Sequence, residues 1–289
     1  MSLDPRIEAA SKFLLQSPPG EINDVLNDVR TIVSDDASLQ TGILPALESY
    51  NVAQFITVDV PGQSHQVIVS EAGRVEGSRH RFIDPRSHTS FELDHIRLET
   101  SDPQAVDPDP ESEPFRAALE TATLAYVADH FTDGVATVFK PSSSPQYVIQ
   151  IVANKYNSTN FWSGRWRSEY TVDVGKGEVV GRVLINVHYY ENGNVQLSAT
   201  HKPTFSFPPY PTLPPTTSAS KILASIELQE GEYQTSLNDT YAEMGEKTFK
   251  GLRRALPLTR QKMDWDKVMG YRLGAELNAS RGATISSSS

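Results

Sequence analysis

The 289-residue chain contains no cysteine. This absence excludes disulfides and thiolate metal ligands, and it suits a reducing compartment. No apolar run approaches the ~20 residues that a membrane-spanning helix needs. Charged residues at Asp4, Arg6 and Glu8 interrupt the start, so no secretory signal is expected. A chain of this length buries a large core without covalent cross-links. We therefore expect a cytoplasmic protein with no membrane span.

Catalytic motifs are lacking as well. The sequence has no P-loop, no H-E-x-x-H motif and no G-x-S-x-G motif. Gly175, Gly177 and Gly181 miss the dinucleotide-binding pattern by one residue and lie between two expected strands. A hairpin turn is favoured over phosphate binding at that place.

The histidines and glutamates of the sequence do not indicate a catalytic or metal site either. Three histidines are too widely spaced for a local metal site and are expected at the surface or in hairpins: His80, His88 and His95. His188 lies among tyrosines in an expected strand, which favours a structural, hydrogen-bonded histidine over a general base. Three glutamates are expected on the solvent-exposed face of a helix: Glu227, Glu230 and Glu232. We predict no catalytic residue, no metal site and no cofactor, hence a non-enzymatic binding protein.

Positive charge is scarce except near the carboxyl end. The formal net charge is −10 and the pI is about 5.2, which argues against general binding to nucleic acids or anionic membranes. The segment from Lys247 to Arg272, however, contains eight Lys and Arg but only two Asp, which gives it a local charge of +6. An anionic partner is expected to meet this segment. Nucleic acid stays the less favoured alternative, either at residues 253–262 or at the cluster of Trp162 and Trp166 with neighbouring arginines.

Periodicity predicts helices first and strands later. Asp4 and Pro5 are an N-cap and a first helical residue, and helices are also expected from Glu21 to Val33 and at 44–50. Short hairpins follow at 54–98, and the acidic, proline-rich residues 102–114 are expected to form an extended linker. A helix opened by Pro114 then precedes the main sheet.

The second half of the chain predicts an antiparallel meander and a long helix. The expected strands are 135–139, 147–153, 161–172, 179–190 and 195–200, with Asn192-Gly193 as a hairpin turn. Residues 203–215 hold six prolines and are expected to be a connector of polyproline character. Ser218 or Ser220 is expected to cap a long helix that Pro257 ends. Its apolar stripe is Ile222, Leu223, Ile226, Tyr233, Leu237, Tyr241, Met244, Leu252 and Leu256.

The carboxyl-terminal segment predicts a short amphipathic helix. Asp264 is its expected N-cap, and Trp265, Val268, Met269, Leu273 and Leu277 share one apolar face. Such a helix either folds back on its own core or enters a partner's groove. We therefore divide the chain into residues 1–53, 54–134, 135–202, 203–257 and 258–289, the last holding the basic segment, this helix and a serine-rich tail.

Three long motifs resemble the F-actin-capping protein alpha subunit family. They are NFWSGRWRSE at 160–169, VHYYENGNVQL at 187–197 and FKGLRRALP at 249–257. Shorter matches are PPGE at 18–21, NDVR at 27–30 and FIDPR at 82–86. The resemblance covers nearly the whole chain.

This resemblance implies a fold, partners and contact residues. The implied fold is α+β, with an N-terminal helical stalk, an antiparallel five-stranded sheet crossed by a long helix, and a C-terminal amphipathic helix called a tentacle. It implies an obligate heterodimer with a capping protein beta subunit that binds the barbed end of the actin filament and blocks subunit addition and loss. Capping a filament of an actin-related protein, as in dynactin, is the alternative. The basic and apolar residues expected to bind actin are Lys250, Arg253, Arg254, Leu256, Arg260, Lys262, Trp265, Lys267, Val268, Met269, Arg272 and Leu273.

Overall fold

The computed structural model describes residues 4–141, 144–191, 194–208 and 211–245. The chain divides into two compact units, Met1–Gln234 and Thr235–Ser289. The elements below lie in the first unit, except the last turns of the final helix. Helices and antiparallel sheets confirm the predicted α+β class. The helix expected at 264–277 lies outside the described residues.

Three helices begin the chain: α1 (Pro5–Leu15), α2 (Ile22–Val33) and α3 (Asp36–Ala53). Asp4 caps α1 as predicted, because its carboxylate accepts a 2.9 Å hydrogen bond from the Arg6 backbone N–H. The expected third helix was too short, since α3 begins well before residue 44 and contains Pro45. The glycine at position 42 of α3 has a packing role. A Cβ there would lie 2.5 Å from a methyl carbon of Ile7, so glycine lets α1 approach α3 closely.

Two small antiparallel sheets follow. The first pairs β1 (Thr57–Asp59) with β2 (Gln66–Ile68), and the second has the order β3 (Arg81–Asp84), β4 (Thr89–Asp94), β5 (Glu99–Ala105). A short 3₁₀ helix, η1 (Glu71–Gly73), connects them. The predicted hairpins are confirmed, but the acidic linker was wrong at its start, because residues 102–105 belong to β5. Backbone pairing with β4 holds this polar sequence in a strand.

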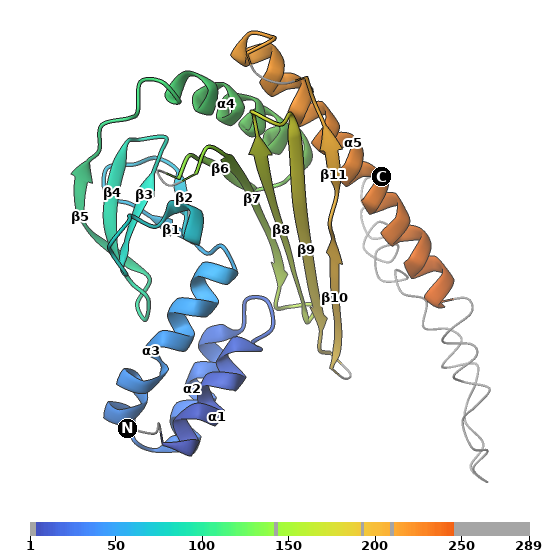
Figure 1. Cartoon of the computed structure of the whole chain (residues 1–289). Coiled ribbons are helices and arrows are strands. Elements are labelled where there is room, and N and C mark those ends of the chain that lie inside the picture. The colour runs from blue at the N-terminus through green and yellow to red at the C-terminus, as the bar shows by residue number, and fades with distance from the viewer. Residues whose placement is uncertain (1–3, 142–143, 192–193, 209–210, 246–289) are drawn as a thin grey trace, which may run out of the picture. The chain divides into compact units, whose positions relative to one another are not determined.

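The main sheet follows α4 (Glu113–His130). Its strands are β6 (Val135–Phe139), β7 (Tyr147–Asn157), β8 (Trp162–Asp173), β9 (Glu178–Tyr189) and β10 (Val195–His201), in the order β10-β9-β8-β7-β6. The predicted meander is confirmed, and Figure 1 shows its strands side by side. Gly177 has a φ of +69° in the turn between β8 and β9, which confirms a hairpin turn at Gly175 and Gly177, whereas Gly181 lies on β9.

The proline-rich connector contains one more strand. β11 (Thr204–Ser206) pairs with Glu178–Val180 of β9, so the expected connector of polyproline character is a strand over these three residues. The last helix, α5 (Pro215–Glu243), begins at Pro215 rather than after Ser218 or Ser220. Proline suits the first turn of a helix because its missing N–H has no partner there. Ser218 is instead a residue within α5, and it is buried.

Candidate interaction surface

The predicted actin-binding residues all lie beyond the last described residue, Gly245. They are Lys250, Arg253, Arg254, Leu256, Arg260, Lys262, Trp265, Lys267, Val268, Met269, Arg272 and Leu273, and they stay predictions. What the structure describes is the helix that precedes them in the chain, α5, and the contacts that fix its first half to the sheet.

Glu230 anchors α5 to both α4 and the main sheet. Its side chain is buried, with the whole residue only 1% exposed. The carboxylate accepts hydrogen bonds from the hydroxyls of Tyr126 on α4 (2.5 Å) and of Ser168 and Tyr170 on β8 (2.6 and 2.8 Å). The indole N–H of Trp166 in turn donates to the Ser168 oxygen at 2.6 Å. The expectation that Glu230 solvates a helix face was wrong, because this residue meets the core instead.

The electrostatics of this anchor depend on burial. Removal from water raises the pKa of Glu230, and the three hydroxyl donors act in the opposite direction by stabilising the carboxylate. Burial also raises the pKa values of Tyr126 and Tyr170, and the charge of Glu230 raises both further. The tyrosines therefore stay protonated donors throughout the physiological pH range. α5 is tied to the sheet by a fully paired polar cluster within the core.

The apolar stripe of α5 is buried along only part of the helix. Ile222, Leu223 and Ile226 are buried as predicted, and they pack in the turns before Glu230. After Glu230, no described residue of α5 is fully buried. Leu228, off the predicted stripe, is 60% exposed. Within the part of the chain that the structure describes, apolar area therefore stays exposed on this helix at Leu228.

The other face of the sheet holds the end of α3. Successive side chains of a strand point to opposite faces, so Arg165 and Arg167 point away from α5. Arg165 donates to the Gln54 side chain at 2.5 Å and to the Tyr50 hydroxyl at 3.1 Å. Arg167 donates to the Gln54 carbonyl at 2.5 Å, and burial, helped by the charge of Arg165, lowers its pKa to about 9. Both arginines are buried, which is against the alternative that they stack on nucleobases.

His188 joins the helical stalk to the sheet. Its Nδ1 lies 2.5 Å from a carboxylate oxygen of Glu21, the residue that precedes α2, and its Nε2 lies 3.1 Å from the Asn194 side-chain oxygen. The residue is 5% exposed. The prediction of a structural, hydrogen-bonded histidine is confirmed.

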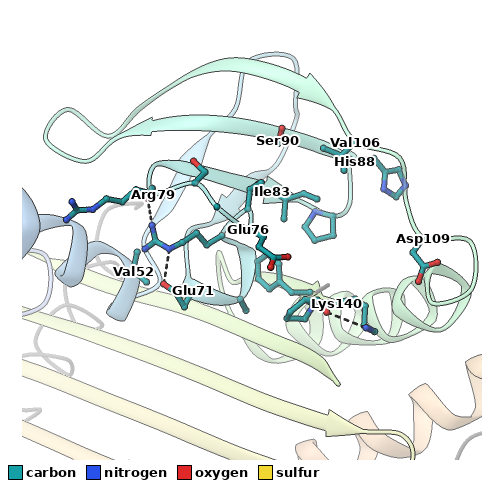
Figure 2. Close-up of a pocket in the computed structure, with 18 of the residues that line it drawn as sticks. Val52, Glu71, Glu76, Arg79, Ile83, His88, Ser90, Val106, Asp109 and Lys140 are labelled. Atoms are coloured by element: carbon teal, nitrogen blue, oxygen red, sulfur yellow. Dashed lines mark hydrogen bonds and ion pairs between the residues drawn. The ribbon is translucent and has the colours of Figure 1, made fainter. Parts of the chain in front are cut away.

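A groove opens between α3, the small sheets and α4 (Figure 2). Its volume is about 1450 Å³, and charged side chains of both signs line it. Arg74 pairs with Glu71 at 2.9 Å, and Arg79 pairs with Glu48 at 3.0 Å. Lys140 donates to the Ser144 carbonyl. Because these cations already have partners, the groove does not present an unopposed basic surface to an anion.

One side-chain cluster combines potential metal ligands. Ligand atoms of Glu48, His80 and His95 all lie within 4.8 Å of one another. The expectation that the histidines lie too far apart in the sequence to come together was wrong for His80 and His95. Pairing of β3 with β4 brings the loop before β3, which holds His80, close to the turn after β4, which holds His95. Burial lowers the pKa of His95 to about 4. Sequence spacing alone carried no signal for this group.

Comparisons with known proteins agree along nearly the whole chain. Residues 10–276 match the family described as F-actin capping protein alpha subunit. The F-actin-capping protein subunit alpha of Emericella nidulans is 40% identical over 277 residues, 96% of this chain and 98% of that protein. The protein of the same description from Caenorhabditis elegans is 37% identical over 282 residues, covering 94% and 97% of the two chains.

A solved structure has the same fold. The homodimeric actin capping protein alpha subunit from Plasmodium berghei superposes with a TM-score of 0.69, covering 90% of this chain and 100% of that one. Its sequence identity of 20% makes this a likeness of fold. A helical stalk, an antiparallel meander and a long anchored helix thus define an α+β protein of the capping-protein class. The chain belongs to the F-actin capping protein alpha subunit family. Among the helices described, none has the length and apolarity to cross a bilayer.

Proposed function

We propose that this chain is the alpha subunit of a heterodimeric actin capping protein, which binds filament barbed ends and blocks the addition and loss of subunits. The match to the family over residues 10–276, with relatives that align along nearly their full length, carries this proposal. The proposed role is binding without catalysis, in the cytoplasm at the actin cytoskeleton.

The partner is proposed to be a capping protein beta subunit. Apolar area left uncovered on α5, including Leu228 at 60% exposure, supports burial against a second chain. The Plasmodium berghei neighbour is described as a homodimer, so two assemblies need to be distinguished. Light scattering with size-exclusion chromatography, with and without a co-expressed beta subunit, separates them. A stable, soluble monomer in both samples contradicts the proposal.

The contact with actin is proposed to use the basic segment and the amphipathic helix near the carboxyl end. Actin is acidic, so Lys250, Arg254 and Arg260 are expected to speed encounter and orient the complex, an effect that salt screens. The apolar face that includes Trp265 and Met269 is expected to enter a cleft and slow dissociation.

Filament growth tests the function directly. The heterodimer is added at substoichiometric concentration to actin filament seeds, and elongation is measured separately at the two ends. Barbed-end growth is expected to stop while pointed-end growth continues at its normal rate. Unchanged barbed-end growth contradicts the proposal. Co-purification with an actin-related-protein complex, without binding to actin itself, favours the dynactin-like alternative.

A further inference from the structure

Glu48, His80 and His95 come from three elements that are distant in sequence. Glu48 lies on α3, His80 directly precedes β3, and His95 follows β4. Glu48 is 7% exposed and His95 is 3% exposed. One carboxylate oxygen of Glu48, Oε1, lies 3.3 Å from Nδ1 of His80. Side chains with this chemistry meet nowhere else as a group of three within the residues that the structure describes.

An unpartnered nitrogen distinguishes this group from an ordinary ion pair. Nε2 of His95 is buried and has no hydrogen-bond partner. An unsatisfied buried polar atom costs about 1–3 kcal/mol, so a ligand for it is expected. Most buried polar atoms in folded proteins have a hydrogen-bond partner, and among the described atoms that lack one, Nε2 of His95 belongs to a group of potential metal ligands.

We propose that Glu48, His80 and His95 bind a divalent transition-metal ion, with Zn²⁺ as the preferred ion. Two imidazoles and one carboxylate are a recognised zinc ligand set that leaves a fourth position for water. Zinc bonds of about 2.0–2.1 Å place tetrahedral ligands roughly 3.3 Å apart, and the distance from His80 to Glu48 is 3.3 Å. The remaining separations, within 4.8 Å, require the side chains to move together by about an ångström. His80, whose side chain is 48% exposed, supplies both that freedom and access from solvent.

The surrounding side chains match an outer shell in part. Arg79 holds the second oxygen of the Glu48 carboxylate, Oε2, at 3.0 Å, which leaves Oε1 for the ion. Outer-shell partners of this kind orient ligating carboxylates. Asn51 donates to the His95 carbonyl at 3.0 Å, and its amide nitrogen lies 3.3 Å from Nδ1 of His95. Ligation through Nε2 puts the proton on Nδ1, so the Asn51 amide must turn its oxygen toward that nitrogen when the ion binds, and it then gives up its hydrogen bond to the His95 carbonyl.

Two cations act against the ion. Arg79 contacts Glu48, and the charge of Arg74 is felt at His95. They lower the affinity relative to a site without positive neighbours. An ion bound there would cross-link α3 to the sheet of β3 and β4, and it would therefore stabilise the fold in proportion to its concentration.

Zinc binding to the full-length chain, purified in its native assembly, tests the site. The protein is stripped with a chelator, dialysed against Zn²⁺ in competition with a chromophoric chelator, and assayed for metal content and melting temperature. We expect one tightly bound ion per chain and a melting temperature that rises with Zn²⁺. The variant His80→Ala removes a half-exposed side chain, so the fold should persist while affinity falls at least about 100-fold, since outer-shell partners alone are worth 10–100-fold.

Matched variants separate this site from adventitious zinc. His88→Asn alters a histidine at the turn end of the same β3–β4 hairpin, away from His80 and His95, whose φ of +50° asparagine tolerates, and it is expected to leave affinity unchanged. Glu48→Gln keeps the shape of the ligand and is expected to weaken binding as His80→Ala does. The proposal is overturned if no ion is retained at one per chain, or if His80→Ala and His88→Asn bind zinc equally well.

Discussion

The Tyr126 hydroxyl donates a 2.5 Å hydrogen bond to the buried carboxylate of Glu230, 104 residues further along the chain. This bond joins α4 to α5, and Ser168 and Tyr170 connect the same carboxylate to β8. The position of α5 on the sheet is thus set by one acidic residue inside the core. Several properties of the protein should depend on it.

Replacing Glu230 with alanine should destabilise the fold strongly. Glu230→Ala leaves three buried hydroxyls without their acceptor, and each unsatisfied group costs about 1–3 kcal/mol, so the free energy of unfolding should fall by at least about 3 kcal/mol. Denaturant unfolding of the native assembly measures this change. Glu232→Ala, at an exposed position of the same helix, is the control and should change stability by less than about 0.5 kcal/mol. Equal effects of the two variants would show that the buried cluster is not the anchor.

The same residue should give stability a pH dependence. Because burial raises the pKa of Glu230 above its ordinary value of 4.5, the folded protein holds this proton more tightly than the unfolded chain does. Its contribution to stability is therefore fully present below about pH 4.5 and is lost as the pH rises through the raised pKa of the folded state. The stability of the wild type relative to Glu230→Gln should fall as the pH rises through that window. A difference that is constant with pH contradicts this assignment.

Gly181 should not tolerate a side chain. A Cβ at this position on β9 would lie 2.5 Å from a ring carbon of Tyr170 and 2.8 Å from a ring carbon of Pro203. Tyr170 is fully buried, so Gly181→Ala should cost about 1–3 kcal/mol through overpacking. Gly175→Ala is the matched control, because the nearest atom to its Cβ lies at an ordinary 3.6 Å. Thermal melts of both variants decide the matter, and equal melting temperatures would refute the prediction.

Neutralising the basic segment should slow capping without unfolding the protein. In Lys250→Ala/Arg254→Ala/Arg260→Ala, the association rate at barbed ends should fall about ten-fold or more at low salt, since electrostatic steering is worth 10–10³-fold. The salt dependence of that rate should flatten in the same variant. Arg182→Ala, an exposed cation on β9, serves as the control and should cap normally. A triple variant with a wild-type association rate removes these residues from the mechanism.

Removing the amphipathic helix should act on dissociation instead. A chain truncated after Gln261 is expected to form the folded assembly, to reach filament ends, and to leave them faster, because the apolar face at 265–277 is gone. Single-filament imaging of the pause at each barbed end measures this. Pauses of unchanged length would exclude the helix from the contact.

The sequence predicted the local structure better than the buried polar chemistry. Alternating apolar residues placed every strand of the meander, and Asp4 with Pro5 placed the start of α1. β11 was missed because three residues among prolines carry no period, and their strand exists only through pairing with β9. Glu230 was missed because a glutamate on a helix is usually solvated, and its burial depends on hydroxyls that arrive from α4 and β8.

The two candidate sites also differ in whether the sequence alone could reveal them. The basic segment was visible in the sequence because its charges lie close together in the chain, though its structure is outside the described residues. The group of Glu48, His80 and His95 was invisible there, because only the pairing of β3 with β4 brings its two histidines together. A cluster assembled by tertiary contacts leaves no trace in local spacing.

The short strand β11 has one more consequence. It extends β10 along the same side of β9, and Gly181 donates to the Pro203 carbonyl at 2.7 Å between the two. The backbone of β9 is thereby occupied at both ends of its length, and prolines flank the strand that covers it. Exposed strand edges recruit foreign strands and start aggregates. The proline-rich residues after β10 thus cover this end of β9 and leave foreign strands no free backbone there to pair with.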